Sequence, residues 1–74
     1  MNEETTPLAN PTELGLAVRA RRKAVGLTQG ELADAAGTSL RLVSEVERGK
    51  ANARLESVLK VLAELGLELY LRPR

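Results

Sequence analysis

The sequence has 74 residues, with 11 basic and 10 acidic side chains, and it contains neither cysteine nor histidine. This composition excludes disulfides, zinc-finger ligand sets, thiol nucleophiles and imidazole general bases, so we expect no metal site, no cofactor and no catalytic residues. A domain of this size buries only about 60% of the surface of its unfolded chain. Such domains usually gain further buried area from a disulfide, a metal or a partner subunit, and only the last remains open here.

The sequence carries no signal for export or membrane insertion. Its first ten residues are polar, with Glu3 and Glu4 and no apolar run, unlike a signal peptide. No stretch approaches the roughly 20 apolar residues of a membrane span. Tyr70 is the only aromatic residue, which disfavours a stacking platform for RNA or single-stranded DNA. We therefore expect a cytoplasmic, nucleoid-associated protein without a membrane partner.

Basic residues are concentrated in the middle of the chain. Between Arg19 and Arg54 there are eight basic residues against four acidic ones, whereas the charged residues before this segment are all acidic and those after it are balanced. A basic centre is typical of a surface that binds phosphate, although charge alone is weak evidence for such a surface.

Capping residues and glycines predict four short helices. Asn10, followed by Pro11 and Glu13, resembles a helix start with a capping box, and Thr28 with Glu31 forms a second such pattern. We expect Ser39 and Asn52 to cap the third and fourth helices. The four predicted helices end at Gly26, Gly37, Gly49 and Gly66, because glycine favours the left-handed conformation at a helix end.

Apolar residues recur at helical spacing in each predicted helix. The positions expected to face inward are Leu14, Ala17, Val18, Arg21 and Val25 in the first helix, Leu32, Ala35 and Ala36 in the second, Val43 and Val46 in the third, and Leu55, Val58, Leu59 and Leu62 in the fourth.

The last segment changes to a two-residue period. Leu67, Leu69 and Leu71 alternate with Glu68 and Tyr70, as in a half-buried strand. A lone strand leaves backbone groups unpaired, so we expect two copies of the chain to pair these strands across a two-fold axis. The alternative is a frayed, extended tail. The predicted organisation is a flexible tail over residues 1–10, a DNA-binding domain over 11–66 and a dimerisation strand with tail residues over 67–74.

The segment from Gly26 to Gly49 carries the functional signal. Ala33, Ala35 and Ala36 allow two helices to cross closely, and Gly37 allows a sharp turn between them. The second helix of such a pair presents its N-terminal residues outward, as a recognition helix does in the major groove.

This segment resembles the Xre/Cro/C1 family of helix-turn-helix proteins. The resemblance rests on an opening Gly26-Leu27-Thr28-Gln29-Gly30-Glu31-Leu32-Ala33, a close of the form Val-x-x-x-Glu-x-Gly from Val43 to Gly49, and an overall match from Leu14 to Leu65. It implies an all-α, lambda-repressor-like bundle of four to five short helices.

The residues after Gly49 narrow the resemblance. Lys50-Ala51-Asn52-Ala53-Arg54-Leu55-Glu56 and Leu65-Gly66-Leu67-Glu68-Leu69 resemble HipB-type antitoxins. Such antitoxins dimerise through a C-terminal strand, repress their own operon and bind a HipA-type kinase toxin. The resemblance therefore implies a homodimeric repressor, a palindromic DNA operator and a HipA-like toxin as partner.

The predicted DNA contacts follow from these positions. Gln29 stands where family members touch phosphate or a base edge, and we expect the backbone N–H groups of Thr28 and Gln29 to point at the DNA. Arg41 is the main candidate for reading guanine, with an ordinary solvated arginine as the alternative. Leu40 offers only an apolar contact, such as one with a thymine methyl group, or packs on its neighbours.

The remaining polar candidates have weaker or different assignments. Ser39 lies on the outward face of the third helix, and Ser44 is either a phosphate or base contact or a surface hydroxyl. Glu45 either accepts a hydrogen bond from a cytosine amine or discourages wrong sites. The resemblance pairs Arg22 with Glu47 in a salt bridge, which gives Arg22 an architectural role first and a phosphate contact second. We expect backbone contacts, or a solvated basic patch, from Arg48, Lys50 and Arg54.

Two alternative functions remain open, and neither is an enzyme. An enzyme is disfavoured because no histidine, cysteine, phosphate loop or paired-carboxylate pocket is present. A protein-interaction module that does not read DNA is the main competitor, and it predicts that Arg41 is dispensable. Among DNA-binding proteins, the alternative is a stand-alone or phage-type regulator without a toxin.

Overall fold

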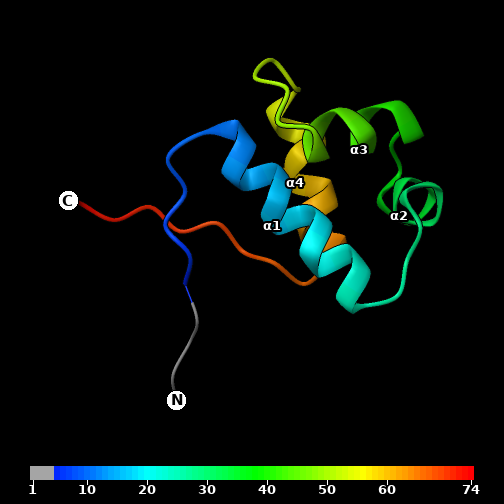
Figure 1. Cartoon of the computed structure of the whole chain (residues 1–74), viewed down its shortest axis with the longest axis horizontal. Coiled ribbons are helices and arrows are strands. Elements are labelled where there is room, and N and C mark those ends of the chain that lie inside the picture. Colours follow the sequence, from blue (N-terminus) through cyan, green and yellow to red (C-terminus); the bar gives the residue numbers. More distant parts are fainter. Residues whose placement is uncertain (1–4) are drawn as a thin grey trace.

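Four helices account for most of the chain. The computed structural model describes residues 5–74, and its helices are α1 (Pro11–Ala24), α2 (Gln29–Ala36), α3 (Leu40–Glu47) and α4 (Leu55–Glu64). Figure 1 shows α2 and α3 on one side of the bundle and both terminal segments on the other. The all-α arrangement with four short helices agrees with the prediction.

The first three helices begin at the predicted caps. Side-chain oxygens of Asn10, Thr28 and Ser39 each accept a hydrogen bond from the backbone three residues later. Glu13 departs from the expected capping box, because its carboxylate accepts from the N–H of Ala9 at 2.6 Å, one residue before the cap. This bond instead fixes the chain that enters α1.

The predicted cap of α4 was wrong. Asn52 lies in a turn, and the helix begins after Arg54, which makes no side-chain capping bond. Glu56 in the first turn interacts favourably with the positive end of the helix dipole. Most of the stability of a helix in a protein comes from packing of its apolar face, so α4 does not depend on a side-chain cap.

All four helices end in the same backbone motif. A glycine with φ between 71° and 82° follows each helix, and the next residue donates its N–H to the carbonyl five residues earlier. This is the Schellman motif, which needs a residue in the left-handed region. The four glycines are the predicted ones, Gly26, Gly37, Gly49 and Gly66, and the donors are Leu27, Thr38, Lys50 and Leu67.

One apolar cluster forms the core. Val18, Leu32, Val43 and Val61 are its fully buried members. Some of the inward positions predicted for α2 and α4 were wrong. In α2, Ala33 is buried and Ala35 is exposed. In α4 and its C-cap, the buried residues are Val58, Val61, Leu62 and Leu65, whereas Leu55 and Leu59 are exposed. The stripe in α4 has the predicted spacing but starts three residues later, at Val58.

The inward face of α1 is narrower than its sequence pattern predicts. Val18 is buried and Leu14 and Ala17 are half-buried, whereas Arg21 and Val25 are exposed. Val25 is the C-cap, beyond the last turn. Arg21 donates from Nε to the carbonyl oxygen of Leu65 at 2.8 Å, so its role is to cap the C-terminal end of α4.

Helices α1 and α3 cross at a glycine that the sequence analysis overlooked. A Cβ atom on Gly15 would lie 2.4 Å from the carbonyl oxygen of Val46 and 2.7 Å from that of Glu47. The start of α1 meets the end of α3 as closely, because a Cβ on Gly49 would lie 2.8 Å from Thr12 Cα. These two glycines fix the separation of the two helices.

Residues 67–74 form no strand within a single chain. Leu67 packs against the core, whereas Leu69 and Tyr70 are exposed and Leu71 is fully exposed. A ladder needs a second strand, and none exists among residues 5–74. The predicted pairing between two copies therefore stays a prediction.

Of the predicted N-terminal tail, residues 1–4 lie outside the described residues and residues 5–9 have no regular structure. No helix within residues 5–74 is long and apolar enough to cross a membrane.

Candidate nucleic-acid interface

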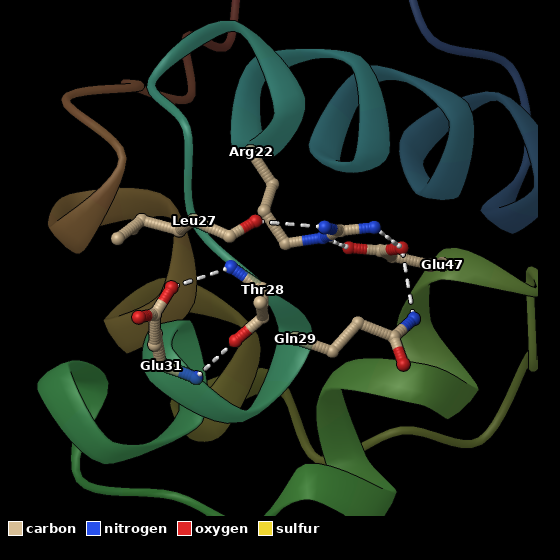
Figure 2. Close-up of polar contacts among 6 residues, drawn as sticks. All are labelled: Arg22, Leu27, Thr28, Gln29, Glu31 and Glu47. Atoms are coloured by element: carbon tan, nitrogen blue, oxygen red, sulfur yellow. Dashed lines mark hydrogen bonds and ion pairs between the residues drawn. The ribbon is translucent and has the colours of Figure 1, made fainter.

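A buried ion pair joins α1 to α3. Arg22 Nε lies 2.6 Å from Glu47 Oε2 and Arg22 Nη2 lies 3.0 Å from Glu47 Oε1, so the guanidinium and the carboxylate meet in a bidentate arrangement (Figure 2). Each residue is only 8% exposed. The salt bridge expected from the family resemblance is present, and its burial makes it an architectural element.

The same pair also fixes the start of α2. Arg22 Nη1 donates to the carbonyl oxygen of Leu27 at 2.8 Å, and Gln29 Nε2 donates to Glu47 Oε1 at 3.0 Å. Figure 2 shows these side chains converging from three parts of the chain. Because α1, the loop before α2 and the end of α3 share one network, the N-terminus of α2 is held at a fixed position relative to α3.

The electrostatics of the network keep both groups charged. The hydrogen bonds that Arg22 donates to Glu47 raise the pKa of Arg22 above its usual value, against the opposing effect of burial. Burial works to raise the pKa of Glu47, but the hydrogen bonds from Arg22 and Gln29 outweigh it and hold that pKa below its usual range. The pair is therefore ionised at neutral pH.

Of the two backbone donors expected to point at DNA from the N-terminus of α2, only one remains free. The carboxylate of Glu31 accepts the N–H of Thr28 at 2.9 Å, while the Thr28 hydroxyl accepts the N–H of Glu31 at 3.0 Å. The expectation that the Thr28 N–H points at DNA was wrong, because the capping box uses it. The N–H of Gln29 is one of the unsatisfied donors of the first turn. The Gln29 amide also keeps one N–H beyond the one given to Glu47.

The outward face of α3 brings most of the predicted readout residues together. Leu40 is 54% exposed and the Arg41 side chain is 83% exposed, while Ser44 is half-buried. Ser39 uses its hydroxyl oxygen to cap the helix by accepting from the N–H of Leu42; its O–H hydrogen remains free to donate. Val43, Val46 and Glu47 face inward, which leaves the opposite face to solvent.

Glu45 lies between two cations on this face. Its Oε2 is 3.0 Å from Arg41 Nε and 3.0 Å from Lys50 Nζ. Hydrogen bonds from Lys50 and Arg41 hold the pKa of Glu45 below its usual range, so the carboxylate is charged at neutral pH.

The two other basic candidates lie at helix ends. Arg48 is the exposed C-cap of α3, and Arg54 is the exposed N-cap of α4.

The contacts that hold the candidate residues in place were not predicted from the sequence. They are the bond between Gln29 and Glu47, the bond between Arg22 and the Leu27 carbonyl, and the close approach at Gly15. The signal for Gly15 was available, since an isolated glycine inside a helical pattern usually has a packing reason.

Comparison with known proteins places this geometry in a family. A profile described as helix-turn-helix matches residues 18–71. The chain belongs to the helix-turn-helix family, in its Xre/Cro/C1 type. The uncharacterized HTH-type transcriptional regulator y4mF of Sinorhizobium fredii is 40% identical over 62 residues, which are 84% of this chain and 82% of that protein. The chain is accordingly a transcriptional regulator of the helix-turn-helix type.

Solved structures extend the likeness to nearly the whole chain. HipB in a HipA-HipB-O2-O3 complex superimposes with a TM-score of 0.85 at 30% identity, covering 93% of this chain and 97% of that one. HipB in an O4 20mer complex gives a TM-score of 0.84 at 30% identity, with the same coverage. The restriction-modification controller protein C.AhdI from Aeromonas hydrophila gives 0.70 at 36% identity, covering 78% of this chain and 84% of that one. This regulator thus has a HipB-like fold.

Proposed function

We propose that this helix-turn-helix regulator is a sequence-specific repressor that inserts α3 into the major groove of a palindromic operator. The observation that carries the proposal is the network of Arg22, Glu47 and Gln29, which fixes the N-terminus of α2 against α3. A recognition helix must be held rigidly for its side chains to discriminate between base edges. The 83% exposed side chain of Arg41 extends from that helix.

The proposed contacts divide into those that read bases and those that set position. Arg41 reads guanine through a bidentate pair, the commonest specific contact in the major groove, and Leu40 contacts a thymine methyl group. Phosphate contacts come from Thr28, Ser39, Arg48 and Lys50. Gln29 and Ser44 contact phosphate or a base edge. Arg22 acts first through its ion pair with Glu47 and only second as a phosphate contact.

We infer a homodimer from the C-terminal segment. Leu71 is 100% exposed, and Leu69 and Tyr70 are exposed beside it, which is an unfavourable arrangement for an isolated chain. Pairing of residues 67–74 between two copies would cover these side chains and satisfy the strand edges. The segment leaves the bundle on the side away from α2 and α3 (Figure 1). Two recognition helices would then reach successive major grooves about 34 Å apart.

The likeness to HipB supports a more specific role. HipB occurs in a complex with HipA, O2 and O3, and the present chain superimposes on HipB over 93% of its length. We therefore propose that the regulator is the antitoxin of a toxin–antitoxin operon, represses that operon and binds a HipA-like kinase toxin. A stand-alone regulator without a toxin is the alternative.

Fluorescence anisotropy with the DNA upstream of the gene tests the repressor role. The wild type should bind this DNA tightly and prefer it to scrambled DNA, whereas Arg41→Ala should keep its fold and lose about 1–3 kcal/mol of discrimination. Lys60→Ala removes the same charge from the exposed surface of α4 and should retain the selectivity. Weak and equal binding to both DNAs would favour a protein-interaction module instead.

Two further measurements separate the remaining parts of the proposal. Sedimentation should show a dimer for the wild type and a monomer for Leu71→Asp, and a wild-type monomer at micromolar concentration would contradict the predicted pairing. Co-expression with the product of the adjacent gene should recover a kinase-like protein bound to the regulator. If no adjacent gene encodes such a protein, the stand-alone alternative applies.

A further inference from the structure

Three charged residues form a cluster at the outward face of α3: Arg41 and Glu45 lie in the helix, and Lys50 follows its C-terminal end. One oxygen, Glu45 Oε2, accepts hydrogen bonds from both Arg41 Nε and Lys50 Nζ, each at 3.0 Å. The Glu45 side chain is only 15% exposed, against 83% for Arg41 and 44% for Lys50. The carboxylate is thus held close to the helix surface, while the two cations lie further out.

The backbone fixes the pair of Glu45 and Lys50. In the Schellman motif that ends α3, the N–H of Lys50 donates to the carbonyl of Glu45 at 3.0 Å, so the two residues are neighbours by construction. This motif usually places an apolar contact between these two positions. Here an ion pair takes its place, and Lys50 keeps the Glu45 carboxylate in position.

Arg41 is the more easily released partner. It pairs with Glu45 at a spacing of four residues, with the base N-terminal to the acid, which is the less favourable order on a helix. Its exposed side chain also loses rotamer entropy when the ion pair holds it in one conformation. Arg41 can therefore leave Glu45 for a base edge while Lys50 remains.

The second carboxylate oxygen of Glu45 has no hydrogen-bond partner in the described part of the chain and is not fully buried. Both cationic partners bind Oε2, so Glu45 Oε1 accepts no hydrogen bond from the described residues. Every fully buried polar side-chain atom of the non-exposed residues among them has a partner, so Oε1 is not one of these buried atoms. In the major groove, the edges of guanine and thymine present acceptors that repel a carboxylate, and adenine presents an acceptor beside its amine. Cytosine alone presents only a donor, its N4 amine.

We infer that Glu45 is a specificity-determining residue that acts mainly by rejection: it lowers the affinity for DNA sites that lack a cytosine amine opposite its Oε1. The inference rests on the proposed placement of α3 in the major groove. At a wrong site, the carboxylate repels the base edge and phosphates and cancels one of the two positive charges beside it. At the operator, the cytosine amine offsets this repulsion and Arg41 moves to guanine.

The variant Glu45→Gln tests the inference. It raises the net charge of the cluster from +1 to +2, so the plot of log affinity for scrambled DNA against log salt should steepen by about 0.9. Affinity for scrambled DNA should rise about fivefold at 0.15 M salt, as that slope implies. Affinity for the operator should change less than twofold, because the weakened cytosine contact offsets the gain, so selectivity falls about fivefold. The control Glu64→Gln removes the same charge at the far end of α4 and should leave the selectivity unchanged.

Base-pair permutation of one operator half-site locates the effect. The wild type should prefer cytosine about tenfold or more at one position, and Glu45→Gln should reduce that preference alone. An equal rise in affinity for operator and scrambled DNA, or no rise for scrambled DNA, would overturn the inference while leaving wild-type selectivity, and hence the proposed function, intact. A wild type that does not discriminate between the two DNAs would overturn both.

Discussion

Replacing Gly15 with alanine should destabilise the domain although alanine is the better helix former. The added Cβ would lie 2.4 Å from the carbonyl oxygen of Val46 and 2.7 Å from that of Glu47, whereas ordinary contacts begin at 3.4 Å. Both neighbours are backbone atoms of a packed helix, so neither can rotate away. Helices α1 and α3 would have to separate by about 1 Å at this point, which also strains the ion pair of Arg22 and Glu47.

The size of the effect follows from two opposing contributions. Overpacking of a close contact costs about 1–3 kcal/mol, and contacts to backbone place Gly15→Ala at the upper end of that range. The higher helix propensity of alanine returns about 1 kcal/mol. The expected net loss in the free energy of unfolding is about 2 kcal/mol, which lowers the Tm of a domain of this size by about 8–16 °C.

Urea unfolding and thermal melts, monitored by circular dichroism, measure this loss, and Gly30→Ala provides a matched control. Gly30 also lies inside a helix, but a Cβ there would meet only the Thr28 hydroxyl, at 4.0 Å. Gly30→Ala should therefore stabilise the domain by about 0.4–1 kcal/mol. If Gly15→Ala were stabilising as well, the close crossing of α1 and α3 would be refuted.

Three further predictions concern the capping box and the buried ion pair. Thr28→Ala removes the cap of α2 and should lower the free energy of unfolding by about 1 kcal/mol in urea titrations; an unchanged value would show that the cap contributes nothing. Glu47→Gln leaves Arg22 buried without its counter-charge and should cost about 3 kcal/mol by the same measurement, and a loss well below 1 kcal/mol would contradict a buried, ionic contact. Because folding lowers the pKa of Glu47, its contribution to stability is complete above the usual value of about 4.3 and is lost as the pH falls through the lower folded value. Acid titration of the free energy of unfolding should therefore be steeper for the wild type than for Glu47→Gln below about pH 4.3, and parallel curves would contradict this.

The helix boundaries were largely predictable because they depend on local chemistry. Three of the four caps and all four glycine stops act through bonds within five residues along the chain, so the sequence contains both partners side by side. Asn52 failed as a cap because the choice between it and Arg54 depends on how the loop before α4 packs. Local preference alone does not determine that packing.

The inward faces were less predictable, since they depend on tertiary contacts. In α4, Leu55 and Leu59 are as apolar as the buried residues, and only the placement of α4 against the rest of the bundle selects the stripe that starts at Val58. Similarly, Ala33 and Ala35 are chemically identical, and the crossing of α2 with its neighbours decides which one is buried.

The candidate site divides in the same way. Its residue types and their helical positions follow from the sequence and the family resemblance, and the ion pair of Arg22 with Glu47 was expected from that resemblance. The bond from Gln29 to Glu47 spans 18 positions of the chain, and the sharing of Glu45 between two cations depends on side-chain conformations. Such contacts require the three-dimensional arrangement.

Methylation protection of guanine N7 in the DNA upstream of the gene tests the central claim most directly, because N7 lies in the major groove and is one of the two acceptors that an arginine would occupy. With bound wild-type protein, the account predicts protected guanines in two half-sites about 10 base pairs apart. Arg41→Ala, bound to the same extent, should lose protection at one guanine in each half-site. Unprotected guanines at saturating wild-type protein would contradict the insertion of α3 into the major groove.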